Sequence, residues 1–211
     1  KDPTRVQPHL KKCFEGIENL TFTDPDQDIT HFISSQKEII KMNTVISTLA
    51  ARGQVEKWML QLEEIMISSI RDITLDAFDD YTQKERIQWV QDWPGQVVLS
   101  VTGAFWTSNT HVAINGGIET LKAYTDECTD EILKVVYLVR GKRPKNVRTT
   151  LGALVVMDVH ARDTLVALQS SGIKKDDEFG WLSQLRYYFE DGLSKERSPE
   201  APGVNPEDLR D

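Results

Sequence analysis

The chain has 211 residues, of which 39% are hydrophobic and 27% are charged, and its formal net charge is -8 at pH 7. This balance is typical of a globular chain and excludes a wholly disordered one. The excess of acidic residues argues against nucleic acid as a partner, because phosphate binding requires a concentrated basic surface.

The first 53 residues predict one short helix followed by a turn-rich segment. Pro8 can begin the helix, since a proline in the first turn lacks only an N–H that the helix does not use there. Residues 20–42 combine a proline flanked by two aspartates with a short alternating stretch at Ile29–Ile33. We expect a turn with some strand character in this segment, and therefore a minor strand content.

Residues 54–189 are predicted to form the helical bundle of the chain. Apolar residues recur there at three- and four-residue steps, which is the spacing of one helical face. A proline disfavours helical conformation in the residue before it, so the Trp-Pro-Gly sequence at Pro94 predicts a corner between two helices. The expected helices cover residues 55 to about 83, 86–92, Pro94 to the Asn-Gly-Gly stop at 115–117, and 118–139.

The C-terminal third holds one ambiguous apolar run. Leu151–Met157 fits a buried strand as well as a buried helix, but its flanks continue the helical spacing, so a buried helix is expected. A last helix is expected to begin at Asp176 and to extend through the aromatic run before residue 190. Residues 190–211 are rich in Pro, Glu, Gly and Ser and predict a disordered tail. The predicted fold class is mainly all-α.

A metal-dependent hydrolase is one alternative, based on Asp158, His160 and Asp163, because these side chains are ligands for zinc, iron or manganese. On a helix, which turns by about 100° per residue, Asp158 and His160 point to nearly opposite sides and do not converge on one ion. Asp158 and Arg162 have the i, i+4 spacing of an ion pair. We therefore expect a structural polar cluster and no metal site; a strand here would restore the metal hypothesis.

Other catalytic signals are also weak. No serine lies in a G-x-S-x-G elbow, and the basic segment Arg140–Arg148 lacks the features of a phosphate-binding P-loop. Cys13 and Cys128 lie far apart, outside any CxxC motif, and are expected to be buried on apolar helix faces in a reducing compartment. No apolar run reaches the ~18 residues of a membrane span, so no membrane contact is expected. We predict no catalytic, cofactor-binding or metal-binding residue in this chain.

Six segments follow one another in an order that resembles a known family. They are DPTRVQPHLKKCFEGI, GQVEKWMLQLEEIM, QWVQDWPGQVVLS, LVRGK, TLGALVVMDVHARD and FGWLSQLRYY. From Asp2 to about Phe189, the chain resembles the C-terminal part of the linker region of dynein heavy chains, just before the first AAA+ module. Short segments such as KKCFEGI and VEKWM are more similar to axonemal than to cytoplasmic dyneins.

The resemblance implies a mechanical role in a ciliary or flagellar motor. In that family the linker is a curved, largely helical rod across the AAA+ ring, and its bending and straightening, driven by nucleotide exchange, produce the power stroke along microtubules. The implied partner is the ring of the same heavy chain. ATP and magnesium, and contacts to microtubules and to dynein intermediate and light chains, would belong to other parts of the parent. The implied location is the axoneme, in the cytoplasm.

The resemblance also implies a division into residues 1–53 and 54–189 of the linker, followed by the tail at 190–211. If force leaves the rod near its C-terminal end, a basic loop and a terminal aromatic segment should grip the ring. The ring-interface candidates are Arg140, Lys142, Arg143, Trp181, Arg186, Tyr187 and Tyr188. A free-standing helical scaffold or adaptor is the alternative from another class of protein.

Overall fold

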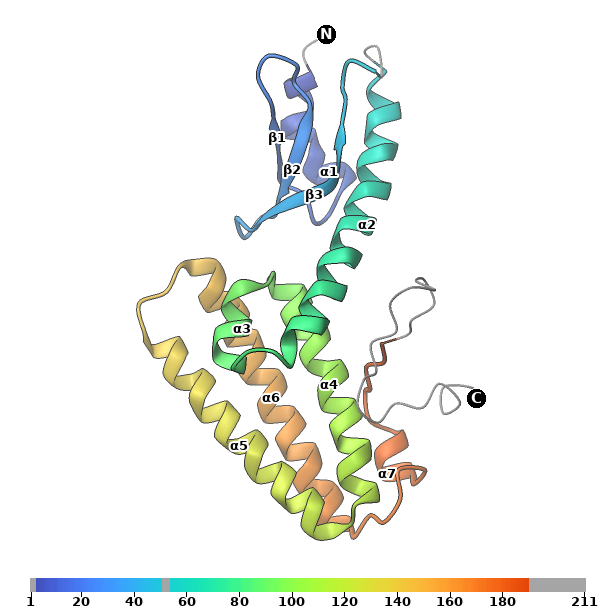
Figure 1. The fold of residues 1–211 in the computed structure, drawn as a ribbon, viewed down its shortest axis with the longest axis vertical. Helices are drawn as coiled ribbons and strands as arrows, with labels where there is room; N and C mark the ends of the chain where they lie inside the picture. Colours follow the sequence, from blue (N-terminus) through green and yellow to red (C-terminus); the bar gives the residue numbers. More distant parts are fainter. Residues whose placement is uncertain (1–2, 51–53, 190–211) are drawn as a thin grey trace. The chain divides into compact units, whose positions relative to one another are not determined.

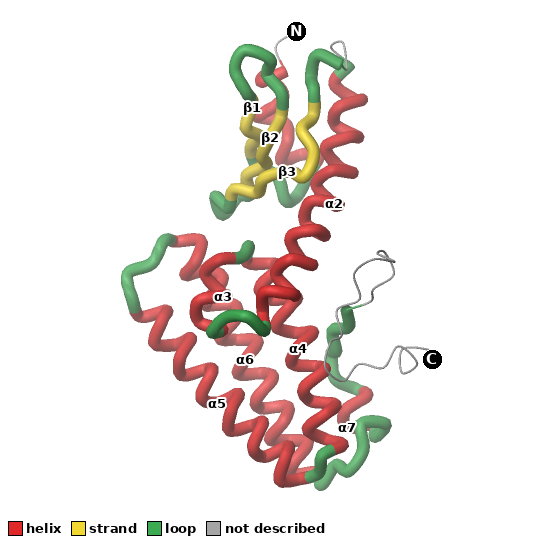
Figure 2. The backbone as a smooth tube through the Cα atoms, viewed as in Figure 1, coloured by secondary structure: helices red, strands yellow, loops and turns green. Residues whose placement is uncertain are grey.

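The structure, a computed structural model, describes residues 3–50 and 54–189 of the chain (Figure 1). The chain is mainly α-helical, as predicted, with one small sheet (Figure 2). It divides into two compact units, Lys1–Phe78 and Asp79–Asp211. The division predicted after residue 53 stays a prediction, and the tail at 190–211 lies outside the described residues.

The first unit is built around an antiparallel sheet of order β1-β2-β3. Its elements are the 3₁₀ helix η1 (Pro3–His9), α1 (Leu10–Cys13), β1 (Asn19–Phe22), β2 (Ile29–Ile33), β3 (Ile39–Ile46) and the greater part of α2 (Val55–Tyr81). Trp58 and Leu62 of α2 share one core cluster with Phe32 and Ile40 of the sheet. The sheet is thus covered by the apolar face of α2.

Strand β3 was not predicted from the sequence, so the sheet is larger than expected. Its buried side chains, Ile40, Met42 and Ile46, do follow the two-residue period of a strand. The apolar Ile39 and Val45 lie on the opposite face, 66% and 55% exposed, and they hide that alternation in the sequence.

Ser69 interrupts the apolar stripe of α2 for a structural reason. Its Oγ accepts a hydrogen bond from the backbone N–H of Asn43 in β3 at 3.0 Å.

The second unit is helical. It contains α3 (Arg86–Asp92), α4 (Gly95–Asn115), α5 (Ile118–Arg140), α6 (Lys145–Ser171) and α7 (Phe179–Leu182). The three long helices α4, α5 and α6 lie side by side (Figure 1). Buried side chains occur on most of the surface of α4, including small residues such as Thr102 and Gly103. Helix α4 is therefore an interior element of this unit.

The local stop signals act where the sequence predicted them. Pro94 is the N-cap of α4, with φ -58° and ψ 145°, and α4 begins at the next residue. Gly117 separates α4 from α5 with a φ of +91°, a conformation that favours glycine because a Cβ clashes there. These positions fix the corner and the tight reversal between consecutive helices.

Three predictions for this region and for the cysteines need correction. Leu151–Met157 is helical as predicted, but only Leu151 and Leu154 are buried, and Val156 is 69% exposed, because the run presents one face to the core. The last helix ends at Leu182, and the aromatic run after it is not helical. Cys13 is exposed, not buried, because it lies at the end of the short helix α1.

Candidate functional site

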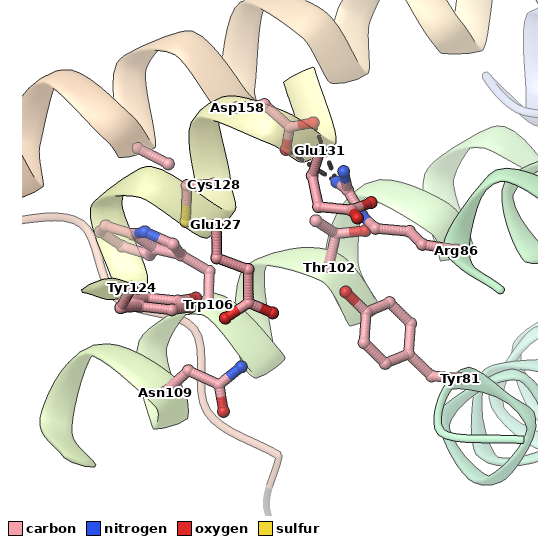
Figure 3. Close-up of a pocket in the computed structure, with 11 residues that line it drawn as sticks. Tyr81, Arg86, Thr102, Trp106, Asn109, Tyr124, Glu127, Cys128, Glu131 and Asp158 are labelled. Carbon is pink, nitrogen blue, oxygen red and sulfur yellow. Dashed lines mark hydrogen bonds and ion pairs between the residues drawn. The ribbon is translucent and has the colours of Figure 1, made fainter. Parts of the chain in front are cut away.

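A polar pocket of about 80 Å³ lies among the helices of the second unit (Figure 3). Side chains from the end of α2 and from α3, α4, α5 and α6 line it. We call it the polar pocket and define it by Tyr81, Arg86, Thr102, Trp106, Asn109, Tyr124, Glu127, Cys128, Glu131, Asp158 and Ala161. Polar groups in a helical interior require partners, so the contacts of this pocket decide what it can do.

A buried ion pair forms one wall of the polar pocket. Nη2 of Arg86 donates to Oδ1 and Oδ2 of Asp158 at 2.8 and 2.9 Å, and the two side chains are 13% and 11% exposed. The predicted pair of Asp158 with Arg162 is wrong, since Arg162 donates to Asp163 at 2.7 Å instead. A solvent-exposed i, i+4 pair stabilises a helix by only ~0.2–0.5 kcal/mol, so the charge-assisted partner across the bundle prevails.

Burial sets the protonation states around this pair. Burial opposes the charge of Arg86, but the carboxylate of Asp158 outweighs it, and the pKa of Arg86 lies above its usual value. Burial raises the pKa of Asp158, and Arg86 lowers it by less. Burial also raises the pKa of Tyr81, and that of the Cys128 thiol to about 11. At neutral pH, the Cys128 thiol is therefore protonated and a poor nucleophile.

The three residues of the metal hypothesis do not share a site in the structure. Asp158 is bound to Arg86, while His160 and Asp163 lie on exposed positions of α6. Among residues 3–50 and 54–189, no group of three or more His, Cys, Asp and Glu side chains is arranged to hold a metal ion. The helical form of this segment accounts for the divergence of the three side chains.

A second cluster fixes the end of the described chain. Residues 183–189, which we call the strap, follow α7 without helical structure. The backbone N–H of Tyr187 donates to Thr107 Oγ1 at 3.0 Å, and that hydroxyl donates to the carbonyl of Gly103 at 2.9 Å. A Cβ at Gly103 would lie 2.8 Å from Cδ2 of Tyr187. Gly103 is therefore needed in the interior of α4, because the Tyr187 ring lies against its backbone.

His111 ties α7 and the strap to α4. The indole N–H of Trp181 donates to Nε2 of His111 at 3.4 Å, and the hydroxyl of Tyr188 lies 3.3 Å from the same nitrogen. Because Nε2 accepts, Nδ1 carries the proton that is donated to Asp176 Oδ2 at 2.8 Å. Burial raises the pKa of Asp176, but hydrogen bonds from His111 and Asn115 outweigh it and lower the pKa below its usual value.

The aromatic interface candidates differ in accessibility. Trp181 is fully buried, edge-on to Trp106 and in one core cluster with Leu121 of α5. Its indole ring is therefore part of the core of the second unit. Tyr188 is 40% exposed, and the guanidinium of Arg186 lies 5.6 Å from the centre of its ring. Of the four candidates in the C-terminal segment, Tyr188 is the exposed one, while Arg186 and Tyr187 are half-buried.

The basic candidates lie on a separate surface. Arg140 ends α5, and Lys142 and Arg143 follow it in the short connection to α6, all of them exposed. We call these three residues the basic loop. Trp181 packs near the other end of α5, at Leu121, and a helix rises 1.5 Å per residue, so about 29 Å of helix separates the two. The structure thus places the predicted ring-interface residues on two separate surfaces.

Comparison with known proteins shows that the chain is similar to dynein heavy chains. Residues 1–77 match the family described as Dynein heavy chain, N-terminal region 2. Over 197 residues, 93% of its length, the chain is 50% identical to human (Homo sapiens) dynein axonemal heavy chain 12, of which it covers 6%. It is 46% identical to mouse (Mus musculus) dynein axonemal heavy chain 3 over 189 residues, which are 90% of the chain and 5% of that protein.

A more distant relative is also an axonemal dynein heavy chain. The chain is 37% identical to human dynein axonemal heavy chain 1 over 189 residues, which are 90% of the chain and 4% of that protein. The resemblance to axonemal dynein heavy chains is confirmed at the level of their N-terminal region. The chain spans about 6% or less of the length of these relatives.

None of the helices in the described residues has the length and apolar character required to cross a membrane.

Proposed function

We propose that this chain is the C-terminal part of the linker of an axonemal dynein heavy chain, preceding the first AAA+ module. Its role would be mechanical: it transmits ATP-driven changes in the ring into a power stroke along microtubules in a cilium or flagellum. The observation that carries this proposal is 50% identity to an axonemal dynein heavy chain over 93% of the chain.

The packing of the second unit supports a mechanical role. The side chains of Val98, Val135, Leu154 and Leu165 are fully buried, and they come from all three long helices. Close-packed interiors have low compressibility and transmit strain. A force applied at one end of α5 is therefore carried along the bundle to its other end.

In this proposal the chain performs no chemistry itself. The carboxylate of Asp158 is engaged by Arg86, and the thiol of Cys128 is held protonated by burial. ATP and magnesium would bind elsewhere in the heavy chain, as the family resemblance implies. Contacts to microtubules and to intermediate or light chains would also lie in other parts of the parent.

Force would leave the linker through its exposed surfaces. The basic loop offers three exposed cations to an acidic surface of the ring, and the pair of Arg186 and Tyr188 offers a second contact of a kind enriched at energetically important interface positions. The buried Trp181 would help to position the second contact. Its indole N–H donates a hydrogen bond to His111, and the same ring nitrogen of His111 lies close to the hydroxyl of Tyr188.

The test is a charge reversal in the intact motor, with Lys142→Glu and Arg143→Glu combined. The proposal predicts slower microtubule gliding with the basal ATPase rate largely retained, because hydrolysis continues while force transmission fails. Lys122→Glu is the matched control, since Lys122 is an exposed lysine on α5 outside the basic loop. If the double variant and the control both glide at the wild-type velocity, the basic loop is not a coupling contact.

A further inference from the structure

The polar pocket contains a concentration of buried polar atoms without partners. Among the residues that the structure describes, four buried side-chain N or O atoms have no hydrogen-bond partner within the chain. Three of them, Thr102 Oγ1, Trp106 Nε1 and Glu131 Oε2, line the polar pocket (Figure 3). The Thr102 side chain is only 6% exposed. Such atoms are costly to bury unsatisfied, so three in one pocket indicate a site for something that bonds them.

The three atoms restrict the charge of a ligand. An anion would meet the carboxylates of Glu127 and Glu131, while Arg86 is already neutralised by Asp158. A cation of the ammonium type can donate to Glu131 but cannot accept the indole N–H of Trp106. Trp106 needs an acceptor, and Thr102 can serve either role. Lys134 Nζ donates to Oε1 of Glu131 at 2.6 Å, so it is the other oxygen, Oε2, that needs a donor. An uncharged group that both donates and accepts satisfies all three.

We propose that the polar pocket is a binding site for small uncharged molecules that both donate and accept hydrogen bonds, such as water or a primary amide. The ligand would accept from Trp106 Nε1 and donate to Glu131 Oε2. Because Trp106 belongs to α4 and Glu131 to α5, the ligand bridges two long helices. The volume of about 80 Å³ exceeds the ~30 Å³ that one water occupies in the liquid, so the site admits several waters or one small organic group.

The test uses the indole N–H signals of the 211-residue chain, labelled with ¹⁵N. The Trp106→Phe variant assigns the signal of Trp106, and backbone-linked assignment serves if that variant does not fold. Water-selective exchange spectra then report bound water next to each indole. Trp93 and Trp181 are internal controls, because their N–H groups donate to Asp80 at 3.0 Å and to His111 at 3.4 Å.

The second arm titrates acetamide, with methylammonium and sulfate as charged probes. The proposal predicts a long-lived water cross-peak at Trp106, or a saturable shift of its indole signal with acetamide, and neither effect at Trp93. The first result makes water the ligand, and the second shows that an amide displaces it. Absence of both overturns the proposal. An equal response to methylammonium or sulfate overturns the uncharged class.

A pair of threonine variants separates the site from a general change in packing. Thr102→Val keeps the shape but removes a pocket hydroxyl, and it should weaken acetamide binding, or shorten the water residence time, by about tenfold, the loss of about one hydrogen bond. Thr129→Val removes a hydroxyl that donates to the Thr125 carbonyl, outside the pocket, and should leave both quantities unchanged. Equal effects of the two variants would contradict the assignment.

Discussion

The contact between Gly103 and Tyr187 gives the sharpest test of how the strap is held. A methyl group at Gly103 would lie 2.8, 2.9 and 3.2 Å from three ring carbons of Tyr187. Real Cβ contacts are longer, so Gly103→Ala must displace the ring or the strap backbone. Overpacking of this kind costs ~1–3 kcal/mol, whereas replacing a helix-interior glycine with alanine stabilises a helix by ~0.5–1 kcal/mol.

These two effects can be separated in a double-mutant cycle with Tyr187→Ala. Without the ring, Gly103→Ala should become stabilising, so its effect on the free energy of unfolding should differ between the two backgrounds by ~1–3 kcal/mol. Urea unfolding followed by circular dichroism measures this difference. Gly152→Ala is the control, since nothing lies within 4 Å of a Cβ there, and it should be mildly stabilising in both backgrounds. If Gly103→Ala behaves like Gly152→Ala throughout, Tyr187 does not lie on α4.

Three other predictions concern the second unit. Asp158→Ala leaves the buried guanidinium of Arg86 without its partner and should lower the free energy of unfolding by ~3–5 kcal/mol, while Asp163→Ala, at an exposed site, should change it by less than ~0.5 kcal/mol. Trp181→Ala should cost ~3–5 kcal/mol in the isolated chain, as for a buried tryptophan; a negligible loss would contradict its core position. The folded-state pKa of Asp176 is lowered, so its stabilisation is present above its unfolded pKa of ~3.9 and is lost as the pH falls through the folded value. Asp176→Asn should therefore be less stable than the wild type at pH 7 and about equal to it near pH 2, which urea unfolding at the two pH values measures.

Helices were predictable where a local signal encodes them. Pro94 and Gly117 act through backbone sterics that depend on the residue itself, so the corner and the reversal could be placed from the sequence. The last helix was overextended because the aromatic run after Leu182 has the composition of a buried face. That run is instead bound to α4 through a hydrogen bond from Tyr187 to Thr107, a contact across 80 residues.

The polar sites depended on partners that no local pattern specifies. Asp158 and Arg86 are 72 residues apart, so the sequence offered only the nearby Arg162 as a partner. An aspartate directly after an apolar run was nevertheless a signal, because a charge next to a buried face needs a partner. Trp181 was chosen for its residue type and for its place in the terminal aromatic segment, and neither property distinguishes a core tryptophan from an interface one.

The proposed mechanical role requires that this segment moves relative to the AAA+ ring when the motor changes its nucleotide state. In a full-length axonemal motor, one fluorophore would replace Tyr137, which is 81% exposed on α5, and its partner would be placed on the first AAA+ module. A second pair, at Tyr137 and the 83% exposed Phe179, reports on the second unit alone. We expect energy transfer to the ring to change between the nucleotide-free and ADP-vanadate states, while transfer within the unit stays constant. Unchanged transfer to the ring between these states would contradict the proposed mechanical role.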